Sequence, residues 1–361
     1  MWSDEFNGPG GTAPDPARWG HDTGGSGWGN SELEYYTNDT ANAALDGHGD
    51  LAITARTAGA PGLSCWYGAC RYTSARLITL GRFTRAYGRI SARIKLPAGP
   101  GLWPSFWALG ANIATAGWPK SGQLVVANSI GKPATVSAGL DGPGYNAWSS
   151  DTLTSGTFAG AFHTFTADWY PDHVSFFADG HPYGGKYRAQ AGPGWVFDHP
   201  FFLLLNLAVG GSQPGSPGAA TTFPQQMLVD WVRVYQAGPP RAAATGPITG
   251  PAGQCAEVDG AGDGAVQLGG CTGSAAQTWT VGPDGTLRTL GGCLGVTAAA
   301  NGTRPQLSAC DATAAQVWQA QTNGQLVNPA TGKCLDATSA NPAPLRIWDC
   351  WGSANQLWTL P

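Results

Sequence analysis

The chain has 361 residues, only 12% of them charged, and a formal net charge of -4. It has no basic stripe, which excludes nucleic acid as a partner class. The longest apolar run, FFLLLNLAV at 201–209, is shorter than the about 20 residues that span a bilayer, so we expect no membrane segment. Abundant Gly (54) and Pro (27), without long charged helical patterns, favour a turn-rich β protein.

Sixteen Trp residues are a large excess for a chain of this kind. One interpretation is sugar binding, because an indole face covers the apolar C–H face of a pyranose while polar neighbours hold its hydroxyls. The alternative is that the rings fill large cores. Composition alone favours sugar binding and leaves both open.

Residues 1–236 alternate short apolar or alternating segments with Gly, Pro, Asn and Asp turns. No helical period extends over more than a couple of turns. We therefore predict an all-β sandwich of two sheets. The expected strands include 49–56, 87–96, 163–170, 173–180, 201–209 and 228–236.

The chain has eight Cys, an even number. Cys65 and Cys70 bracket a short loop, and the other six follow residue 250. No CxxC metal pairs occur and the His residues are scattered, which argues against zinc. We expect disulfides and a secreted, extracellular protein.

A linker is predicted at 237–252, AGPPRAAATGPITGPA, because it lacks a hydrophobic period and is rich in Pro, Ala and Gly. The last domain, 253–361, repeats itself three times, each copy running Cys, about 16 residues, Cys, then Gln-x-Trp. One such unit cannot bury its own core, but three around an axis can.

The first domain closely resembles glycoside hydrolase family 16, in particular its laminarinase-like β-1,3-glucanases. The motifs that carry the resemblance are WSDEFNG (2–8), SGWGNSELEYYT (26–37) and the segments 74–110, 195–211 and 223–236. The resemblance implies a concanavalin-like jelly-roll sandwich with a sugar-binding cleft. The cleft residues that it implies are Asn30, Arg76, Trp103, Trp107 and Trp118. Trp103 and Trp107 share one face of a regular strand because their spacing is even, although either ring could instead pack into the core.

Retaining glycosidases need two carboxyl groups about 5 Å apart. The family places its acids on one strand as Glu-x-Asp-x-x-Glu, and the five-residue spacing requires a β-bulge to bring both ends to one face. The matching segment here is GQLVVAN, 122–128. Gln123 stands at the nucleophile position, Val125 at that of the tuning Asp and Asn128 at that of the acid/base. None of the three can perform its family role.

Further departures are Ser137 and Asp141, where the family typically has two His, and Gln213, where an aromatic residue is common. Asp141, Glu34 and Asp168 are the acids that we weigh as substitutes. Of these, Asp141 is expected to face the cleft. The resemblance also implies a structural calcium held by Glu5 and Asp230, since hard oxygen ligands suit this ion, although both can equally be ordinary surface acids.

The three-repeat domain resembles the ricin-B-type lectins, the β-trefoil of carbohydrate-binding module family 13. The resemblance implies one disulfide within each repeat and a sugar site of an acid, an aromatic ring and an Asn-Gln pair. Only the third repeat has the set: Asp336, Trp348, Asn355 and Gln356, with Arg346 where Gln is usual. The first has Glu257, Gly269 and Ala276, and the second Gly295, Ser308 and Ala315. We expect one working site, although Asp336 and Trp348 could be structural.

The sequence thus predicts a secreted, monomeric carbohydrate-binding protein. An inactive laminarinase-like domain would bind β-1,3-glucan, and a lectin module with one competent repeat would follow it. The rival class is an active endo-β-1,3-glucanase with non-standard catalytic residues. A third class is a structural surface protein without sugar affinity.

Overall fold

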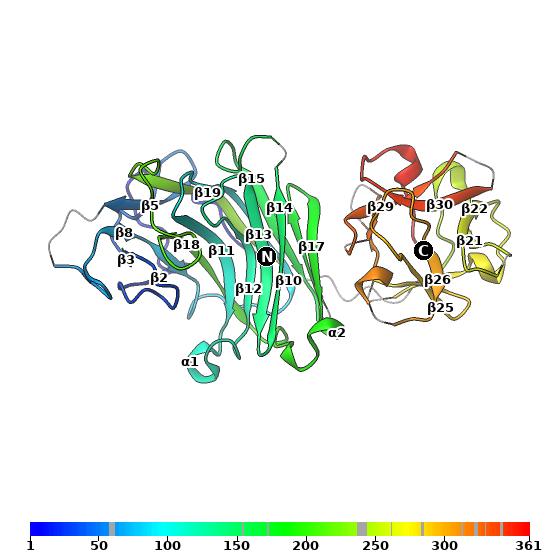
Figure 1. Ribbon diagram of the computed structural model, residues 1–361, viewed down its shortest axis with the longest axis horizontal. Coiled ribbons are helices and arrows are strands. Elements are labelled where there is room, and N and C mark those ends of the chain that lie inside the picture. The colour runs from blue at the N-terminus through cyan, green and yellow to red at the C-terminus, as the bar shows by residue number, and fades with distance from the viewer. Residues whose placement is uncertain are drawn as a thin grey trace. The chain divides into compact units, whose positions relative to one another are not determined.

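The computed structural model describes residues 1–57, 62–153, 155–171, 173–236, 244–260, 262–282, 285–311, 313–320, 324–328, 330–339 and 342–361. The chain divides into two compact units, and the main boundary between them follows residue 237. Strands make up most of the regular structure in both units (Figure 1). The expected all-β class is confirmed.

One layer of the first unit is a ten-stranded sheet. Its strands, in spatial order, are β17 (His181–Tyr187), β16 (His173–Ala178), β15 (His163–Trp169), β10 (Gly88–Lys95), β19 (Gln225–Tyr235), β5 (Leu51–Thr57), β8 (Tyr72–Ser74) and β3 (Glu34–Tyr36). Two further strands pair off this path, β1 (Trp2–Asp4) with β19 and β4 (Ala43–Leu45) with β5.

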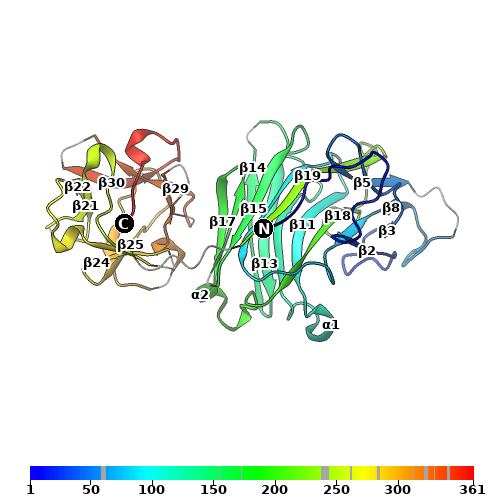
Figure 2. The same cartoon turned by 180° about the vertical axis from the view of Figure 1, so that it is seen from behind.

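The other layer is a seven-stranded sheet, which lies against the first as Figures 1 and 2 show from opposite sides. Its strands, in spatial order, are β14 (Tyr145–Thr152), β13 (Thr135–Gly142), β12 (Gln123–Asn128), β11 (Leu102–Gly110), β18 (Phe201–Val209), β9 (Arg76–Ile78) and β2 (Gly20–Asp22). The remaining short elements are β6 (Ser64–Cys65), β7 (Gly68–Ala69), α1 (Ile113–Ala116), α2 (Arg188–Ala191) and η1 (Gly192–Gly194).

The core of the first unit lies between these two sheets. Alternate side chains point inward because successive residues of a strand face opposite sides. On β11, for example, Leu102, Phe106 and Ala108 belong to the core. Trp103 and Trp107 alternate with them and are absent from that cluster. The two rings therefore share the face turned away from the core, which we call the outer face.

The second unit is a β-trefoil built from the three repeats. One of its sheets contains β20 (Ala244–Gly246), β23 (Trp279–Val281), β24 (Leu287–Thr289), β25 (Gly292–Gly295) and β26 (Gln306–Ser308). The other contains β21 (Cys255–Val258), β22 (Val266–Gly269), β30 (Ala343–Trp348), β29 (Lys333–Ala337), β28 (Leu326–Asn328) and β27 (Gln319–Ala320). Short 3-10 turns are η2 (Pro251–Gly253), η3 (Ala275–Gln277), η4 (Ala314–Gln316) and η5 (Ala354–Gln356).

The second half of the expected linker is part of the trefoil. β20 pairs with β23, and Ile248 is a buried member of the second core. Residues 237–243 of that linker lie outside the described residues. The lack of a hydrophobic period therefore led to a linker prediction that extends too far into the second unit. A three-residue strand such as β20 is too short to show a hydrophobic period.

Four disulfides link Cys65 to Cys70, Cys255 to Cys271, Cys293 to Cys310 and Cys334 to Cys350. The last three confirm one bridge within each repeat. No helix in the described part of the chain is long and apolar enough to cross a membrane.

Candidate functional site

Three rows of side chains cross the outer face, because paired residues of neighbouring strands stand directly opposite one another. The first row holds Asp22, Arg76, Asn206, Ser105, Asn128, Ser137 and Ser150. The second holds Gly20, Ile78, Leu204, Trp107, Val125, Gly139 and Trp148. The third holds Phe202, Leu109, Gln123, Asp141 and Asn146.

A β-bulge in β12 brings the three expected catalytic positions to this one face. The register of β12 shifts against β11 after Phe106 and against β13 between Val125 and Asn128. Val126 and Ala127 both join the core at the shift. As a result Gln123, Val125 and Asn128 occupy adjacent rows despite their odd spacing, as the sequence predicts.

Arg76 is held between two aromatic rings on the outer face. Its Cζ lies 4.7 Å from the Trp28 ring centroid and 4.9 Å from that of Trp107. Asp22 pairs with its Nε at 3.0 Å. Two cation–π contacts and a carboxylate fix the guanidinium in place. An arginine held in this way can donate hydrogen bonds to a ligand oxygen only from its terminal nitrogens.

A chain of hydrogen bonds runs from Trp107 to Asn30. Trp107 Nε1 donates to Asn206 Oδ1 at 2.7 Å, and Asn206 Nδ2 donates to the Tyr36 hydroxyl at 3.0 Å. That hydroxyl donates to Glu32 Oε2 at 3.1 Å, and Asn30 Nδ2 donates to Glu32 Oε1 at 2.9 Å. Asn30 thus shares one polar network with the Trp107 ring, as expected of residues that line one surface.

Asp141 lies beside Gln123 and is held by three donors. Gln123 Nε2 donates to Asp141 Oδ2 at 3.2 Å, Trp148 Nε1 donates to Oδ1 at 3.3 Å, and Asn146 Nδ2 donates to Oδ1. Burial raises the pKa of the Asp141 carboxyl, and the hydrogen bonds from Trp148 and Asn146 oppose the rise. The structure thus places Asp141 on the outer face, as the sequence predicts.

Asn128 is buried in the floor of the same face, with 2% of its surface exposed. In the amide orientation that satisfies its neighbours, Oδ1 accepts from Trp103 Nε1 at 3.3 Å and Nδ2 donates to the Ser137 carbonyl at 3.3 Å. The amide therefore positions the Trp103 indole. An amide in this place has no proton to give to a leaving oxygen.

The other two acids weighed as substitutes lie elsewhere. Glu34 is fully buried, and its Oε2 accepts from the Val209 N–H at 2.6 Å. Burial, and then repulsion from Glu32, raise the pKa of Glu34 well above its usual range. Asp168 belongs to the ten-stranded sheet and is paired with Arg89 at 2.7 Å. Neither acid joins the outer-face rows.

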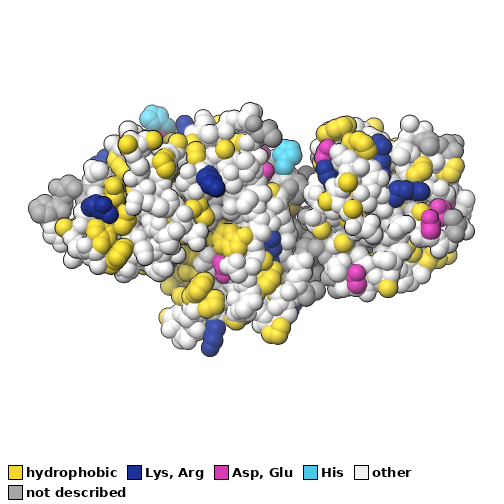
Figure 3. Space-filling model, viewed as in Figure 1, with side chains coloured by type: hydrophobic (Ala, Val, Ile, Leu, Met, Phe, Trp, Pro, Cys, Tyr) yellow, Lys and Arg dark blue, Asp and Glu magenta, His cyan; other side chains and the backbone are white. Residues whose placement is uncertain are grey.

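Part of the outer face is a small apolar cluster that neighbouring side chains cover. Leu109, Phe202 and Leu204 are buried there, packed against Trp107 and Ile113 of α1 among other partners. Trp118 follows α1 and is 62% exposed. Of the expected cleft residues, Trp118 is the one whose ring presents most of its surface to solvent. Figure 3 shows that few charged side chains gather on the first unit in that view.

Glu5 and Asp230, the expected calcium ligands, are each engaged by an arginine. Arg233 forms two hydrogen bonds with Glu5, at 3.0 and 2.8 Å, and lowers the pKa of that carboxyl. Arg93 pairs with Asp230. Among the described residues, no three His, Cys, Asp or Glu side chains are grouped as a metal site. Calcium would have to displace both arginines to bind these two carboxylates. The calcium site stays a prediction.

In the third repeat, Asp336 is the centre of a polar cluster and is only 2% exposed. Arg346 Nε donates to its Oδ1 at 2.7 Å, and Asn355 Nδ2 donates to Oδ2 at 2.7 Å. Gln356 Nε2 donates to Oδ2 at 3.1 Å. The Arg346 guanidinium also lies 4.1 Å from the centroid of the Trp348 ring, so it covers one face of that ring. All five expected residues are thus brought together.

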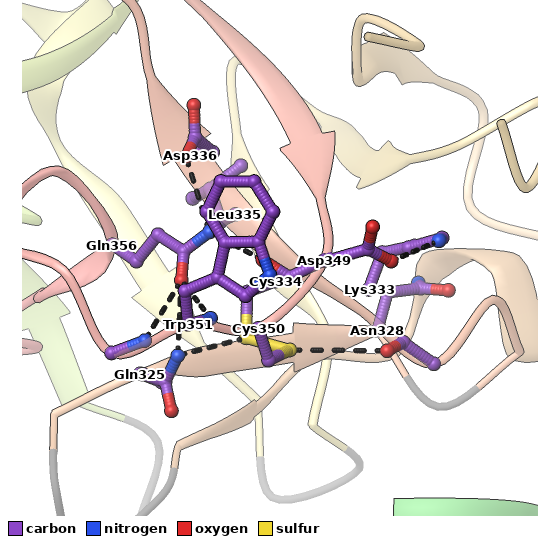
Figure 4. The surroundings of a disulfide bond; sticks show 12 residues. Gln325, Asn328, Lys333, Cys334, Leu335, Asp336, Asp349, Cys350, Trp351 and Gln356 are labelled. Carbon is purple, nitrogen blue, oxygen red and sulfur yellow. Dashed lines mark hydrogen bonds and ion pairs between the residues drawn. A yellow bond between two sulfur atoms is a disulfide. The ribbon is translucent and has the colours of Figure 1, made fainter. Parts of the chain in front are cut away.

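Gln356 has a structural role that recurs in all three repeats. Its Oε1 accepts from the Trp351 N–H at 2.9 Å, and its Nε2 donates to the Asp349 carbonyl at 2.8 Å (Figure 4). Gln277 and Gln316 bind the equivalent backbone groups of their own repeats, the N–H after the second Cys and the carbonyl before it. Gln356 is fully buried, so it can affect a ligand only indirectly, through its hydrogen bond to Asp336.

The first two repeats fill the equivalent space with their own atoms. In the first, a Cβ placed on Gly269 would lie 2.4 Å from Glu257 Oε1. In the second, Gln316 Nε2 donates to Ser308 Oγ at 2.9 Å, and a Cβ on Gly295 would lie 2.9 Å from Gln316 Cγ. Neither repeat offers a ring at the aromatic position.

Sequence reasoning missed four residues of these sites: Asn206, Trp28, Asn146 and Trp351. Asn206 could have been found, because it is the one polar residue in the apolar run 201–209. Trp351 directly follows Cys350 and is 72% exposed, with its ring 6.5 Å from that of Trp348. Trp28 is placed by its contact with Arg76 on a distant segment, and Asn146 by its pairing with Asp141 across the β13–β14 hairpin.

Comparison with known proteins matches both units. The model of "Glycosyl hydrolases family 16" matches residues 28–233, and that of the "Ricin-type beta-trefoil lectin domain" matches residues 244–358. A "Beta-glucanase" of Rhodothermus marinus is 36% identical over 253 residues, which are 65% of this chain and 84% of that protein.

A solved laminarinase catalytic domain from Thermotoga maritima MSB8 is 40% identical, with a TM-score of 0.62 over 66% of this chain and 98% of that chain. A "Beta-1,3-glucan-binding protein" of Penaeus monodon is 31% identical over 189 residues, which are 43% of this chain and 51% of that protein.

An aromatic-rich sandwich face followed by a three-repeat trefoil defines a modular protein of the carbohydrate-active class. More particularly, the chain belongs to glycosyl hydrolase family 16 and carries a C-terminal ricin-type β-trefoil lectin domain.

Proposed function

We propose that this chain is a secreted carbohydrate-binding protein whose family 16 unit holds a glucan without hydrolysing it. The observation that carries the proposal is the occupancy of the β12 outer face by Gln123, Val125 and Asn128. Gln123 is no carboxylate nucleophile, and Asn128 has no acidic proton. Val125 cannot tune the protonation of a neighbour.

The acids that remain in the outer-face rows are too far apart to act as a pair. They are Asp22 on β2 and Asp141 on β13, five strand steps apart in the sheet. At about 4.8 Å per step they lie roughly 24 Å apart. Retaining glycosidases need about 5 Å between carboxyl groups and inverting ones about 6.5–9.5 Å. Of the two acids in the described outer-face rows, Asp141 is the one that stands opposite Gln123.

A β-1,3-linked glucan is the ligand that we propose for the first unit. Trp28, Arg76 and Trp107 form a fixed aromatic and cationic surface, and Asn206 and Asn30 lie in the connected polar network. Such a surface suits the alternation of C–H faces and hydroxyls on a sugar. The relatives named as laminarinase and as β-1,3-glucan-binding protein support this choice of linkage.

The third trefoil repeat is proposed as the one working lectin site. It alone combines an acid, an aromatic ring and the Asn-Gln pair, whereas its sister repeats fill that space themselves. We propose that the chain acts as a monomer, and its four disulfides support an extracellular location.

The rival function is an active endo-β-1,3-glucanase that uses Asp141. It is favoured by the names of the relatives, which include a "Beta-glucanase". The raised pKa of Asp141 would suit a general acid. Against the rival function, the described outer-face rows hold no second carboxyl within reach of Asp141.

Reducing-sugar release from laminarin separates the two functions. We expect none above a no-protein control for the wild type. Release should appear in the triple variant Gln123→Glu, Val125→Asp, Asn128→Glu, which supplies the missing acids on an intact face. Wild-type turnover that Asp141→Asn abolishes would overturn the proposal and establish the rival.

The third class, a structural protein without sugar affinity, is tested by retention on insoluble β-1,3-glucan. The wild type should be retained and eluted by soluble laminarin. Recovery of the protein in the unbound fraction, together with no heat in a calorimetric titration with glucan oligosaccharides, would favour the structural class.

A further inference from the structure

The third trefoil repeat differs from its two sisters at four positions that surround one carboxylate. Counted from the second Cys, the position of Arg346 is held by Gln267 and Gln306 in the other repeats. Trp348 replaces Gly269 and Ser308, Trp351 replaces Thr272 and Asp311, and Asn355 replaces Ala276 and Ala315. A repeat that served only the fold would not need four different residues around one carboxylate.

Within the described residues, Arg346 is fixed by two interactions, and neither involves its two terminal nitrogens as hydrogen-bond donors. Its Nε donates to Asp336 at 2.7 Å, and its Cζ lies 4.1 Å from the centroid of the Trp348 ring. The side chain is 32% exposed. Arginine carries five N–H donors, so its two terminal nitrogens still have donors to offer beside the stacked ring.

The charges around this guanidinium favour an anion as the group that binds it. Asp336 is already paired with Arg346 itself, and its second oxygen accepts from Asn355 and Gln356. Asp349, the other acid between residues 334 and 361, is paired with Lys333 and Asn301. Each carboxylate is thus balanced by a cation, Asp336 by Arg346 and Asp349 by Lys333, so the acids leave no unbalanced negative charge at the site. The planar fork of an arginine matches a carboxylate in two parallel hydrogen bonds.

We propose that the third repeat binds an anionic glycan, in which a carboxylate or sulfate of the sugar meets the terminal nitrogens of Arg346. The proposal rests on the lectin function given above and names the ligand class of that site. Trp351 stands at 70° to Trp348 and offers a second ring for the sugar unit that follows along the chain. Gln at this position, as in the sister repeats, would offer fewer donors and no charge.

The test is calorimetric titration of the full chain with three probes of equal length and linkage: a neutral oligoglucose, an oligoglucuronate and a sulfated oligoglucose. Asp336→Asn provides the correction for binding by the first unit, because it removes the centre of the third-repeat cluster. The carboxylated or the sulfated probe should bind the wild type at least about tenfold more tightly than the neutral one, and added salt should reduce that preference. The two anionic probes distinguish the two sources of charge.

Arg346→Gln copies the residue of the sister repeats, and we expect it to fold. It should abolish the preference for the anionic probe and its salt dependence. Arg346→Lys keeps the charge without the fork and should give an intermediate preference. Thermal unfolding of each variant checks that the trefoil is intact.

A wild type that binds the neutral probe as tightly as the anionic ones would overturn the inference while the lectin function stands. So would an Arg346→Gln variant that keeps the preference. If no probe shows binding that depends on Asp336, then both the inference and the lectin function of this repeat are wrong.

Discussion

Arg76 is the residue at which the aromatic and polar parts of the outer face meet. Two indole rings, from Trp28 and Trp107, hold its guanidinium, and Asp22 anchors one edge. A cation held between rings loses little conformational freedom when a ligand arrives. This arrangement makes Arg76 the most informative single residue for glucan binding.

Arg76→Ala should weaken binding of laminarin oligosaccharides roughly tenfold, because it removes a charged hydrogen-bond donor and releases two rings. Arg89→Ala is the matched control, since Arg89 forms an ion pair with Asp168 on the other sheet. Isothermal titration of both variants checks the prediction. Equal affinities for the two variants would remove Arg76 from the binding surface.

Glu34 provides a pH test at the same scale. Its native pKa is raised by burial and by Glu32, so the native state binds the proton more tightly than the unfolded state. Stability is therefore full below the unfolded pKa of about 4.3 and falls by up to about 1.4 kcal/mol per pH unit toward the raised value.

Glu34→Gln keeps an acceptor for the Val209 N–H and does not titrate. The melting temperature of the variant should therefore fall less than that of the wild type as the pH rises from about 5 to 8. Thermal scans across this range measure the difference. Parallel curves for the two proteins would show that Glu34 ionises in the native state without this penalty.

At the scale of elements, the bulge in β12 determines which chemistry the outer face can carry. Without it, Gln123 and Asn128 would point to opposite sides of the sheet. With it, both side chains join the outer-face rows while Val126 and Ala127 enter the core. The strand thus keeps the register that paired acids require although it carries none.

The Gln-x-Trp motif is the corresponding element of the trefoil. Each Trp donates its indole N–H to a carbonyl near the first Cys of its repeat, and each Gln binds the loop after the second Cys. These buried bonds close every repeat on itself. The Gln-x-Trp motif therefore recurs in all three repeats mainly because it stabilises the fold of each repeat, and only secondarily because of sugar binding.

Gln316→Ala and Gln356→Ala test this division of roles. Each should destabilise the trefoil by about 1–3 kcal/mol, because buried backbone groups lose their partner. On the proposal that the third repeat holds the lectin site, Gln356→Ala alone should also weaken sugar binding. Scanning calorimetry and sugar titration measure the two effects. A Gln316→Ala variant that loses sugar affinity as fully as Gln356→Ala would contradict the division.

Much of this architecture could be predicted from local pattern. The strands at 87–96 and 201–209 are visible as apolar or alternating segments. The threefold repeat is visible in the sequence, and its resemblance to the ricin-B-type lectins implies the trefoil and its bridges. The stacking of Arg76 between Trp28 and Trp107 joins three distant segments and has no local signature. The stacking of Arg346 on one face of Trp348 also has no local signature in the sequence.

At the scale of the whole molecule, one chain joins two units with different binding surfaces. The family 16 unit offers an aromatic and cationic face, and the lectin unit offers one repeat built around Asp336. Linked sites gain affinity on a polymer when both are engaged at once. A binding protein gains affinity for a polysaccharide from this arrangement even when it does not hydrolyse the polysaccharide.

The central claim is that the first unit binds a β-1,3-glucan and leaves it intact. Its most direct test is calorimetric titration of the wild-type chain with a β-1,3-linked glucose hexasaccharide, followed by chromatography of the sugar recovered from the cell. We predict a saturable heat of binding and an unshortened hexasaccharide. Shorter oligosaccharides in the recovered sample, or the absence of any heat, would contradict the account.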